Sequence, residues 1–371
     1  INIKTVVISD DEAAPAKNFC DKFIYAKYNN EDKIDEFVQA SNIVTFEFEN
    51  IPYETLKKIS QKRPVFPDPS INKIVQNRYT EKNFINKIGI KTTKFTLIKK
   101  KEDLLNNKDL LPGILKTCTL GYDGKGQYKI NSLNEISNLN IDFNNEYILE
   151  KIITLKKEIS IIITRFKNNT YQAYEPIENI HQDQILKNSK IPAQIDKIIF
   201  DQSISWAKKI SEKLNYIGTM CVEYFIDQNN ILYVNEIAPR VHNSGHLTIN
   251  AYNISQFENH VRAACQLDKI ELKKISNAEM INIIGKEITN YQNKKFSKNE
   301  FFFDYLKETI KDKRKRSEDK DLLIELGKAY DVKFEELKKS LIEKLYNILG
   351  GKTCQGVFND LEEEVLPKGK K

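Results

Sequence analysis

A short apolar run that ends in a dense group of polar side chains most constrains the fold of this chain. Residues 231–234 (ILYV) read as a buried strand, and residues 235–246 (NEIAPRVHNSGH) follow directly. These twelve residues hold a carboxylate, amides, a guanidinium and two imidazoles around Pro239 and Gly245. A fold does not need so many polar groups at a strand end, whereas a site for a metal and an anion does. The pattern therefore predicts a sheet with a functional site where this strand ends.

A second strand offers a partner carboxylate. Residues 221–225 (CVEYF) are apolar except for Glu223, and a turn at 227–230 joins them to the first strand. We expect Glu223 and Glu236 to face one another across this hairpin. Two carboxylates beside the amide of Asn235 suit Mg²⁺ that is bridged to substrate phosphates. Satisfied polar residues at strand ends are the alternative, which the neighbouring guanidinium and imidazoles disfavour.

Composition fits a soluble enzyme of several domains. The 371 residues are 40% hydrophobic, and no run approaches the roughly 18–20 apolar residues of a membrane span. The first residues lack the layout of a signal peptide. Five widely spaced cysteines without a C-x-x-C pair argue against a zinc or disulfide framework and for a reducing, cytoplasmic compartment. Lysines scattered among Asn and Ile explain the net charge of +6 better than nucleic-acid binding does.

The order of predicted elements indicates an α/β region followed by a strand-rich one. Short β-branched runs lie at 3–9 and 43–48, strand-rich text at 90–165, and helical patterns at 32–39, from Ser70, at 195–215 and at 255–266. The runs at 3–9 and 43–48, together with the helical patterns at 32–39 and from Ser70, predict a small parallel α/β unit that reaches about residue 85. Residues 319–349 repeat apolar positions at helical spacing among charges, which predicts one or two amphipathic helices.

A glycine-rich segment, residues 115–127 (LKTCTLGYDGKGQ), is the second chemical feature. Its three glycines within six residues let backbone N–H groups approach phosphate oxygens, and Lys116 on the preceding strand can reach the same phosphates. The segment is neither a Walker A loop nor a G-x-G-x-x-G fingerprint. Taken alone, it also fits a loose hairpin. The two carboxylates later in the chain favour phosphate binding.

A strand between these two features ends in a short linker at residues 147–153 (YILEKII). Such a linker exposes a backbone amide and carbonyl, which recognition of adenine requires. Glu158, at the start of the next strand, is placed to accept hydrogen bonds from ribose hydroxyls.

Glycine-rich loop, linker and paired carboxylates in this order resemble the ATP-grasp fold, in which two α+β lobes clamp MgATP. Within that fold, the chain closely resembles the 5-(carboxyamino)imidazole ribonucleotide synthases, the ATP-dependent carboxylases of purine biosynthesis. The matching strings are residues 45–52 (TFEFENIP), 121–127 (GYDGKGQ), 178–181 (ENIH), 235–246 and 255–258 (SQFE). The resemblance covers about residues 1–315. It implies an α/β and α+β chain with an incomplete N-terminal parallel α/β (pre-ATP-grasp) domain, because the family begins with a strand and glycine-rich turn that this text lacks.

The resemblance also implies a division into domains. They are an N-terminal α/β domain without its first strand at 1–85, the ATP-grasp nucleotide-binding lobes at 86–285, a partial C-terminal domain at 286–316 and a helical tail at 317–371. The tail text, notably residues 351–357 (GKTCQGV) and 363–369 (EEVLPKG), resembles instead a piece of the bacterial RNA polymerase β subunit.

Each matching residue acquires an implied role. Contacts to ATP phosphates are implied for Arg78, Lys116, Gly121, Tyr122, Asp123, Gly124, Lys125, Gly126 and Gln127. Contacts to the nucleoside are implied for Glu150, Lys151, Ile152, Ile153, Glu158 and His181. Glu223 and Glu236 would bind Mg²⁺, with Asn235 beside it among the ATP-binding residues. The ribonucleotide would lie against Glu47, Lys307 and Arg314, and bicarbonate against Arg240, His242 and Asn243.

The implied reaction is the carboxylation of 5-aminoimidazole ribonucleotide by ATP and bicarbonate through carboxyphosphate, in a homodimer that uses Mg²⁺. Two alternatives stay open. One is another ATP-grasp ligase, such as formate-dependent glycinamide ribonucleotide transformylase or a carboxylase of another amine, although the HNSGH string favours the carboxylase. The other is a non-catalytic hybrid chain that only binds nucleotide. His260 reads as a histidine on a helix face, and His246 has no assigned role.

Overall fold

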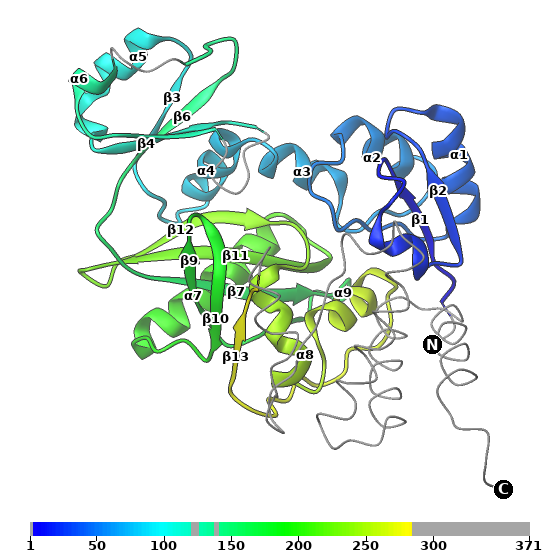
Figure 1. Cartoon of the computed structure of the whole chain (residues 1–371). Helices are drawn as coiled ribbons and strands as arrows, with labels where there is room; N and C mark the ends of the chain where they lie inside the picture. The colour runs from blue at the N-terminus through cyan, green and yellow to red at the C-terminus, as the bar shows by residue number, and fades with distance from the viewer. Residues whose placement is uncertain (1–2, 120–125, 137–140, 284–371) are drawn as a thin grey trace, which may run out of the picture. The chain divides into compact units, whose positions relative to one another are not determined.

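The computed structural model describes residues 3–119, 126–136 and 141–283 (Figure 1). The described residues divide into two compact units, with the boundary between Asn42 and Ile43, and the second unit reaches Asn282. Within the described part of the chain, no helix is long and apolar enough to cross a membrane.

The first unit contains a pair of parallel strands and a helix among its described residues. Its elements are β1 (Val6–Ser9), η1 (Pro15–Asn18), β2 (Lys22–Tyr25) and α1 (Glu31–Ala40). Asn30 caps α1, and the helix buries an apolar face that includes Ile34 and Phe37. The strand expected within residues 3–9 and the helix expected at 32–39 are confirmed.

The strand expected at residues 43–48 is wrong. Val44 forms only an isolated parallel bridge with Val65, through backbone hydrogen bonds with Pro64 and Phe66, and residues 45–50 form no strand. Just beyond the expected strand, the carbonyl of Glu49 accepts a hydrogen bond of 2.7 Å from the side chain of Gln76. The run therefore pairs with a neighbouring segment at one residue only, and a side chain rather than a strand binds the backbone after it.

Three helices lead from there to the two sheets of the second unit. They are α2 (Tyr53–Ser60), α3 (Pro69–Val75) and α4 (Arg78–Lys87). The side chain of Asn77 accepts hydrogen bonds from the backbone N–H groups of Tyr79 and Thr80 and so caps α4. This cap fixes where α4 begins, and hence the direction in which Arg78 points.

A small antiparallel sheet carries the predicted phosphate lysine and the linker. Its strands run in the order β3 (Phe95–Ile98), β6 (Tyr147–Lys151), β4 (Gly113–Thr117) and β5 (Gln127–Ile130). The short helices α5 (Lys101–Asn106), η2 (Lys108–Leu110) and α6 (Leu133–Ile136) accompany them. Leu115, Ile130 and Leu149 are among the residues of its own apolar core.

A larger sheet carries the paired carboxylates. Its strand order is β12 (Leu232–Ala238), β11 (Gly218–Asp227), β7 (Leu155–Arg165), β9 (Ile177–Gln182), β10 (Ile185–Ile191) and β13 (Ala278–Ile281), with β8 (Tyr171–Ala173) paired to β7. The accompanying helices are α7 (Lys197–Lys213), η3 (Asn243–Leu247), α8 (Thr248–Ala251) and α9 (Gln256–Ala264). The helices expected at 195–215 and 255–266 are confirmed.

Alternate residues of the central strands pack into two different cores. Val222 lies in one core together with Ile210 of α7, whereas its neighbour Cys221 lies in the other together with Ala251 of α8. Helices therefore cover both faces of the sheet, which explains why its central strands are almost continuously apolar. Glu223 is the one charged residue among residues 221–225 of β11, which are otherwise apolar.

Candidate active site

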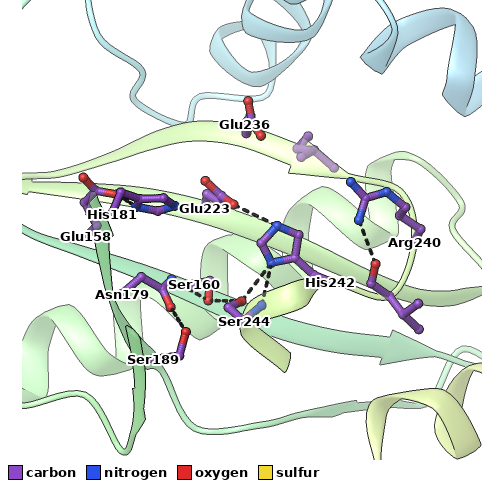
Figure 2. Close-up of polar contacts among 12 residues, drawn as sticks. Glu158, Ser160, Asn179, His181, Ser189, Glu223, Glu236, Arg240, His242 and Ser244 are labelled. Carbon is purple, nitrogen blue, oxygen red and sulfur yellow. Dashed lines mark hydrogen bonds and ion pairs between the residues drawn. The ribbon is translucent and has the colours of Figure 1, made fainter. Parts of the chain in front are cut away.

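Two glutamates face each other on neighbouring strands of the larger sheet (Figure 2). Glu223 of β11 and Glu236 of β12 are direct partners in the antiparallel register. Directly opposed residues have their side chains on the same face of a sheet. The hairpin expected from the sequence is confirmed, and it brings the two carboxylates together.

The register slips by one residue beside this pair. Tyr224 pairs with Val234, so Asn235 is an extra residue that forms a β-bulge. Val234 is buried in the core, whereas Asn235 and Glu236 both line the cavity described below, and the Asn235 side chain forms a hydrogen bond with Glu223. A regular strand would send successive side chains to opposite faces. The bulge therefore places two successive polar side chains on the cavity side.

One cavity of about 740 Å³ gathers most of the predicted site residues. Those that line it are Arg78, Lys116, Gln127, Glu150, Lys151, Ile152, Ile153, Glu158, His181, Glu223, Asn235, Glu236, Arg240, His242 and Asn243. Glu47 and Gly126 do not line it. The remaining predicted contacts lie outside the described residues, and they are Gly121, Tyr122, Asp123, Gly124, Lys125, Lys307 and Arg314.

Gly126 has a structural role at the end of the glycine-rich segment. Its carbonyl accepts a hydrogen bond of 3.0 Å from the Thr117 backbone, and its φ of +72° favours glycine. A Cβ on Gly126 would also press against the Thr117 side chain. The residue thus joins β4 to β5 next to the predicted phosphate lysine.

Buried charges surround that lysine. Lys116 Nζ lies 3.1 Å from one oxygen of Glu150, and Lys82 Nζ lies 3.1 Å from the other. Thr93 donates a further hydrogen bond to Glu150. Burial alone would raise the pKa of Glu150, but Lys116 and Lys82 outweigh it and lower the pKa to about 2. Glu150 is therefore an ionised carboxylate that holds Lys116 at the edge of the cavity.

The two opposed glutamates fit a divalent cation that is shared with phosphate. Glu236 lies 3.0 Å from Arg78 and Glu223 lies 3.0 Å from His242, so both carboxylates now have cationic or hydrogen-bonding partners. Among the described residues, no cluster of three or more His, Cys, Asp or Glu could hold a metal by itself. One or two carboxylates completed by phosphate oxygens and water are the usual ligands of Mg²⁺ in phosphoryl-transfer enzymes. The donor set fits Mg²⁺ in that form.

A chain of buried hydrogen bonds holds His242 (Figure 2). Its Nδ1 lies 2.8 Å from Ser244 Oγ, which lies 2.8 Å from Ser160 Oγ. Asn179 donates to Ser160, and Ser189 donates to Asn179. These side chains come from η3, β7, β9 and β10, so four separate segments fix one imidazole.

The same contacts decide where the hydrogen of His242 sits. His242 Nδ1 accepts the backbone N–H of Ser244 at 3.3 Å, which requires a lone pair on that nitrogen. We therefore assign the ring hydrogen to Nε2, which donates to Glu223 at 3.0 Å.

Two further ion pairs flank this centre. His181 Nδ1 lies 2.5 Å from Glu158, whose hydrogen bond raises the pKa of His181. Arg240 Nε lies 2.9 Å from Glu49, and Glu47 also attracts this guanidinium. The cavity therefore has an acidic and histidine-containing wall on one side and a partly buried arginine on the other.

Comparisons with known proteins agree with this geometry. A ribonucleotide synthetase preATP-grasp domain matches residues 1–76, and an ATP-grasp domain matches residues 83–257. N5-carboxyaminoimidazole ribonucleotide synthase of Staphylococcus aureus (strain MRSA252) is 37% identical over 296 residues, which are 78% of this chain and 78% of that protein. The chain belongs to this synthase family. The Bacillus subtilis (strain 168) synthase is 34% identical over 288 residues, 77% of this chain and 76% of its own length.

Solved structures of the synthase family show the same fold. The Staphylococcus aureus N5-carboxyaminoimidazole synthetase complexed with ADP superposes with a TM-score of 0.74 at 36% identity, and the match covers 78% of each chain. The expected ATP-grasp fold with a pre-ATP-grasp domain is confirmed. The predicted domain boundaries stay predictions, and the tail that resembles RNA polymerase lies outside the described residues and the matched ranges.

Sequence reasoning missed three charged residues of this synthase-family site. Glu49 contacts Arg240, while Glu81 and Lys82 of α4 contact β12, which is far from them in the chain. Glu49 lies in the matching string at 45–52, two residues after Glu47, and that spacing was a usable signal. Glu81 and Lys82 gave no such signal, because charges at the start of a helix usually face solvent.

Proposed function

We propose that this chain carboxylates 5-aminoimidazole ribonucleotide to 5-(carboxyamino)imidazole ribonucleotide with ATP and bicarbonate, in purine biosynthesis. The observation that supports it most is the register pair Glu223–Glu236, which shares one cavity with Lys116, Arg240 and His242. Phosphate, metal and anion chemistry would thus meet in one place, as a reaction that activates bicarbonate with ATP requires.

Activation of bicarbonate is the first chemical problem. Bicarbonate is a poor electrophile because its hydroxyl is a poor leaving group. In the proposed first step, a bicarbonate oxygen bonds to the γ-phosphorus of ATP, and the bond to the ADP oxygen breaks. Mg²⁺ bound to Glu223 and Glu236 would neutralise phosphate charge. Lys116 and Arg78 line the same cavity and would stabilise the charge on the transferred group.

Capture of the activated carboxyl group is the second step. The substrate amine bonds to the carboxyl carbon, phosphate leaves, and the nitrogen loses a proton. Arg240 is well suited to hold the planar carboxylate, because a guanidinium donates two parallel hydrogen bonds. Asn243 and His242 line the cavity beside it. His242, as a donor from Nε2, would orient Glu223 rather than remove the amine proton.

Recognition of the ribonucleotide is proposed for Glu47, Lys307 and Arg314. Glu47 lies close enough to Arg240 to attract its guanidinium. Lys307 and Arg314 lie outside the described residues. The glycine-rich loop at 121–127 is proposed as a lid over the phosphates, and the homodimer and cytoplasmic location stay predictions as well.

Separate assays with two substrate pairs distinguish the carboxylase from the other ATP-grasp ligase. ADP release is measured with aminoimidazole ribonucleotide and bicarbonate, and separately with glycinamide ribonucleotide and formate. We expect turnover only with the first pair. Turnover with the second pair alone would assign a transformylase, and nucleotide binding without turnover of either pair would indicate the non-catalytic chain.

A further inference from the structure

Helix α4 presents two adjacent buried ionisable side chains to the strand that carries Glu236. Glu81 and Lys82 are each only 2% exposed, and neither has a role in the chemistry described above. Among the described residues, β12 is the first strand of its sheet, and its outer edge forms only an isolated parallel bridge between Val234 and Thr92. An edge strand leaves unpaired backbone groups that other parts of the protein must satisfy.

The two side chains bind that edge on either side of Glu236. Lys82 Nζ donates to the carbonyl of Asn235 at 3.1 Å. Glu81 Oε1 accepts from the backbone N–H of Ile237 at 2.6 Å. Two adjacent helical residues therefore hold the backbone immediately before and after the predicted metal ligand.

The held segment is the β-bulge itself. In a regular strand, Asn235 and Glu236 would point to opposite faces, whereas the bulge turns both into the cavity. The direction of these side chains depends on the orientation of the peptide groups that Lys82 and Glu81 bind. The second contact of Lys82, with Glu150, connects the bulge to the carboxylate that holds Lys116.

We propose that Glu81 and Lys82 are positioning residues that hold the bulge of β12, so that Asn235 and Glu236 face the bound metal and phosphates. Glu81 lines the cavity and Lys82 does not, and each binds the backbone of β12, through which we expect it to act. The inference rests on the proposed function, because it supposes that Mg²⁺ and ATP bind at Glu223 and Glu236. It explains why two ionisable side chains lie in the interior at the start of α4.

Calorimetry of ATP binding with and without Mg²⁺ tests the role directly. The measured quantity is the ratio of the two dissociation constants, which reports on the metal ligands rather than on folding. We call the factor by which Mg²⁺ tightens ATP binding the gain from Mg²⁺. In Lys82→Met and Glu81→Leu, we expect this gain to fall by about 10-fold to 100-fold, the usual range for residues that support metal ligands. Glu81→Gln keeps an oxygen acceptor for Ile237 and should retain the gain within about twofold.

Arg165→Met is the matched control. Arg165 is also a buried cation, at 7% exposure, and it donates to a backbone carbonyl, that of Tyr216, at 2.8 Å. Its removal should lower the melting temperature and leave the gain from Mg²⁺ unchanged. Circular dichroism identifies the temperature at which each variant is folded. If Lys82→Met does not fold, the comparison of Glu81→Leu with Glu81→Gln decides.

The outcomes separate this inference from the proposed function. A normal gain from Mg²⁺ in the unmodified chain, with the same gain in Lys82→Met or Glu81→Leu, would overturn the positioning role alone. An equal loss in Arg165→Met would also overturn it, because the effect would then be general destabilisation. No gain from Mg²⁺ in the unmodified chain would overturn the metal site and this inference together.

Discussion

At the scale of single residues, Glu236 is the side chain on which the proposed chemistry depends most. Glu236→Gln keeps the size of the side chain but removes one charged oxygen from the opposed pair. A metal supplies several kcal/mol to phosphoryl transfer, and about 1.4 kcal/mol is a tenfold change in rate. We therefore expect ADP release to fall at least about a hundredfold while the melting temperature changes little.

A matched control uses a glutamate far from the cavity. Glu212 of α7 is exposed and forms a 3.8 Å ion pair with Lys208 on the surface. Glu212→Gln should leave ADP release unchanged, since such surface pairs contribute little. Normal ADP production by Glu236→Gln would remove Glu236 from the metal site.

His260 gives a pH-dependent prediction at the same scale. It is 7% exposed, and its Nδ1 accepts the backbone N–H of Thr219 at 3.0 Å, which requires a neutral imidazole. Burial lowers the pKa of His260 from 6.5 to about 4. Because its pKa is depressed in the folded state, the stabilisation is present above pH 6.5 and is lost as the pH falls toward 4.

The size of the effect follows from the shift. Each pKa unit corresponds to about 1.4 kcal/mol, so His260 should account for up to about 3 kcal/mol of the stability lost on acidification. Denaturant unfolding between pH 7 and pH 4 measures it by the difference from His260→Gln, in which this loss should be absent. An identical pH dependence in both proteins would contradict neutral burial. The difference is needed because burial also lowers the pKa of His246 to about 4.

At the scale of elements, the turn after β12 is held against α9 by one amide side chain. Gln256 accepts from the N–H of His242 at 2.9 Å and donates to its carbonyl at 2.6 Å. A Cβ on Gly245 would overlap this amide. Gly245→Ala should therefore displace His242 as well as Gln256.

We expect Gly245→Ala to impair carboxylation more than nucleotide binding. Overpacking of a buried site typically costs about 1–3 kcal/mol of stability, and a displaced His242 should raise the KM for bicarbonate. Steady-state kinetics and ATP calorimetry separate the two effects. Gly89→Ala is the control, because a Cβ there meets only the end of the Lys209 side chain, although its φ of +73° adds backbone strain. An unchanged KM for bicarbonate in Gly245→Ala would contradict the coupling between this turn and His242.

The elements also show what the sequence could predict. The opposed glutamates were predictable, because polar residues interrupt two apolar runs that a turn separates. The helices at α7 and α9 were predictable from their apolar spacing. The absence of a strand at 43–48 was not predictable. A β-branched run does not reveal that a side chain binds the backbone just beyond it.

The supporting contacts of the site were beyond prediction for a different reason. The hydrogen-bond chain from His242 to Ser189 joins four segments that are far apart in the sequence. The bulge at Asn235 leaves only a weak trace, two polar residues in succession between apolar ones. Such features depend on the strand order and register, which local patterns do not encode.

At the scale of the whole molecule, the tail at 317–371 is predicted to be dispensable for the core. The matched family ranges end at residue 257, and the site residues described here all precede the tail. Deletion of residues 317–371 should therefore leave the melting temperature and ATP affinity nearly unchanged. Calorimetry of the two chains side by side measures both quantities. A loss of several degrees on deletion would show that the tail is an integrated part of the fold.

Transfer of labelled bicarbonate into the ribonucleotide is the reaction that the proposed site must perform. The chain is incubated with MgATP, aminoimidazole ribonucleotide and isotopically labelled bicarbonate, and labelled product and ADP are counted together. We predict one labelled carboxyamino product for each ADP, and neither product when ribonucleotide, bicarbonate or the Glu236 carboxylate is removed. ADP release without label in the ribonucleotide, or at the same rate without ribonucleotide, would contradict the assignment as a carboxylase.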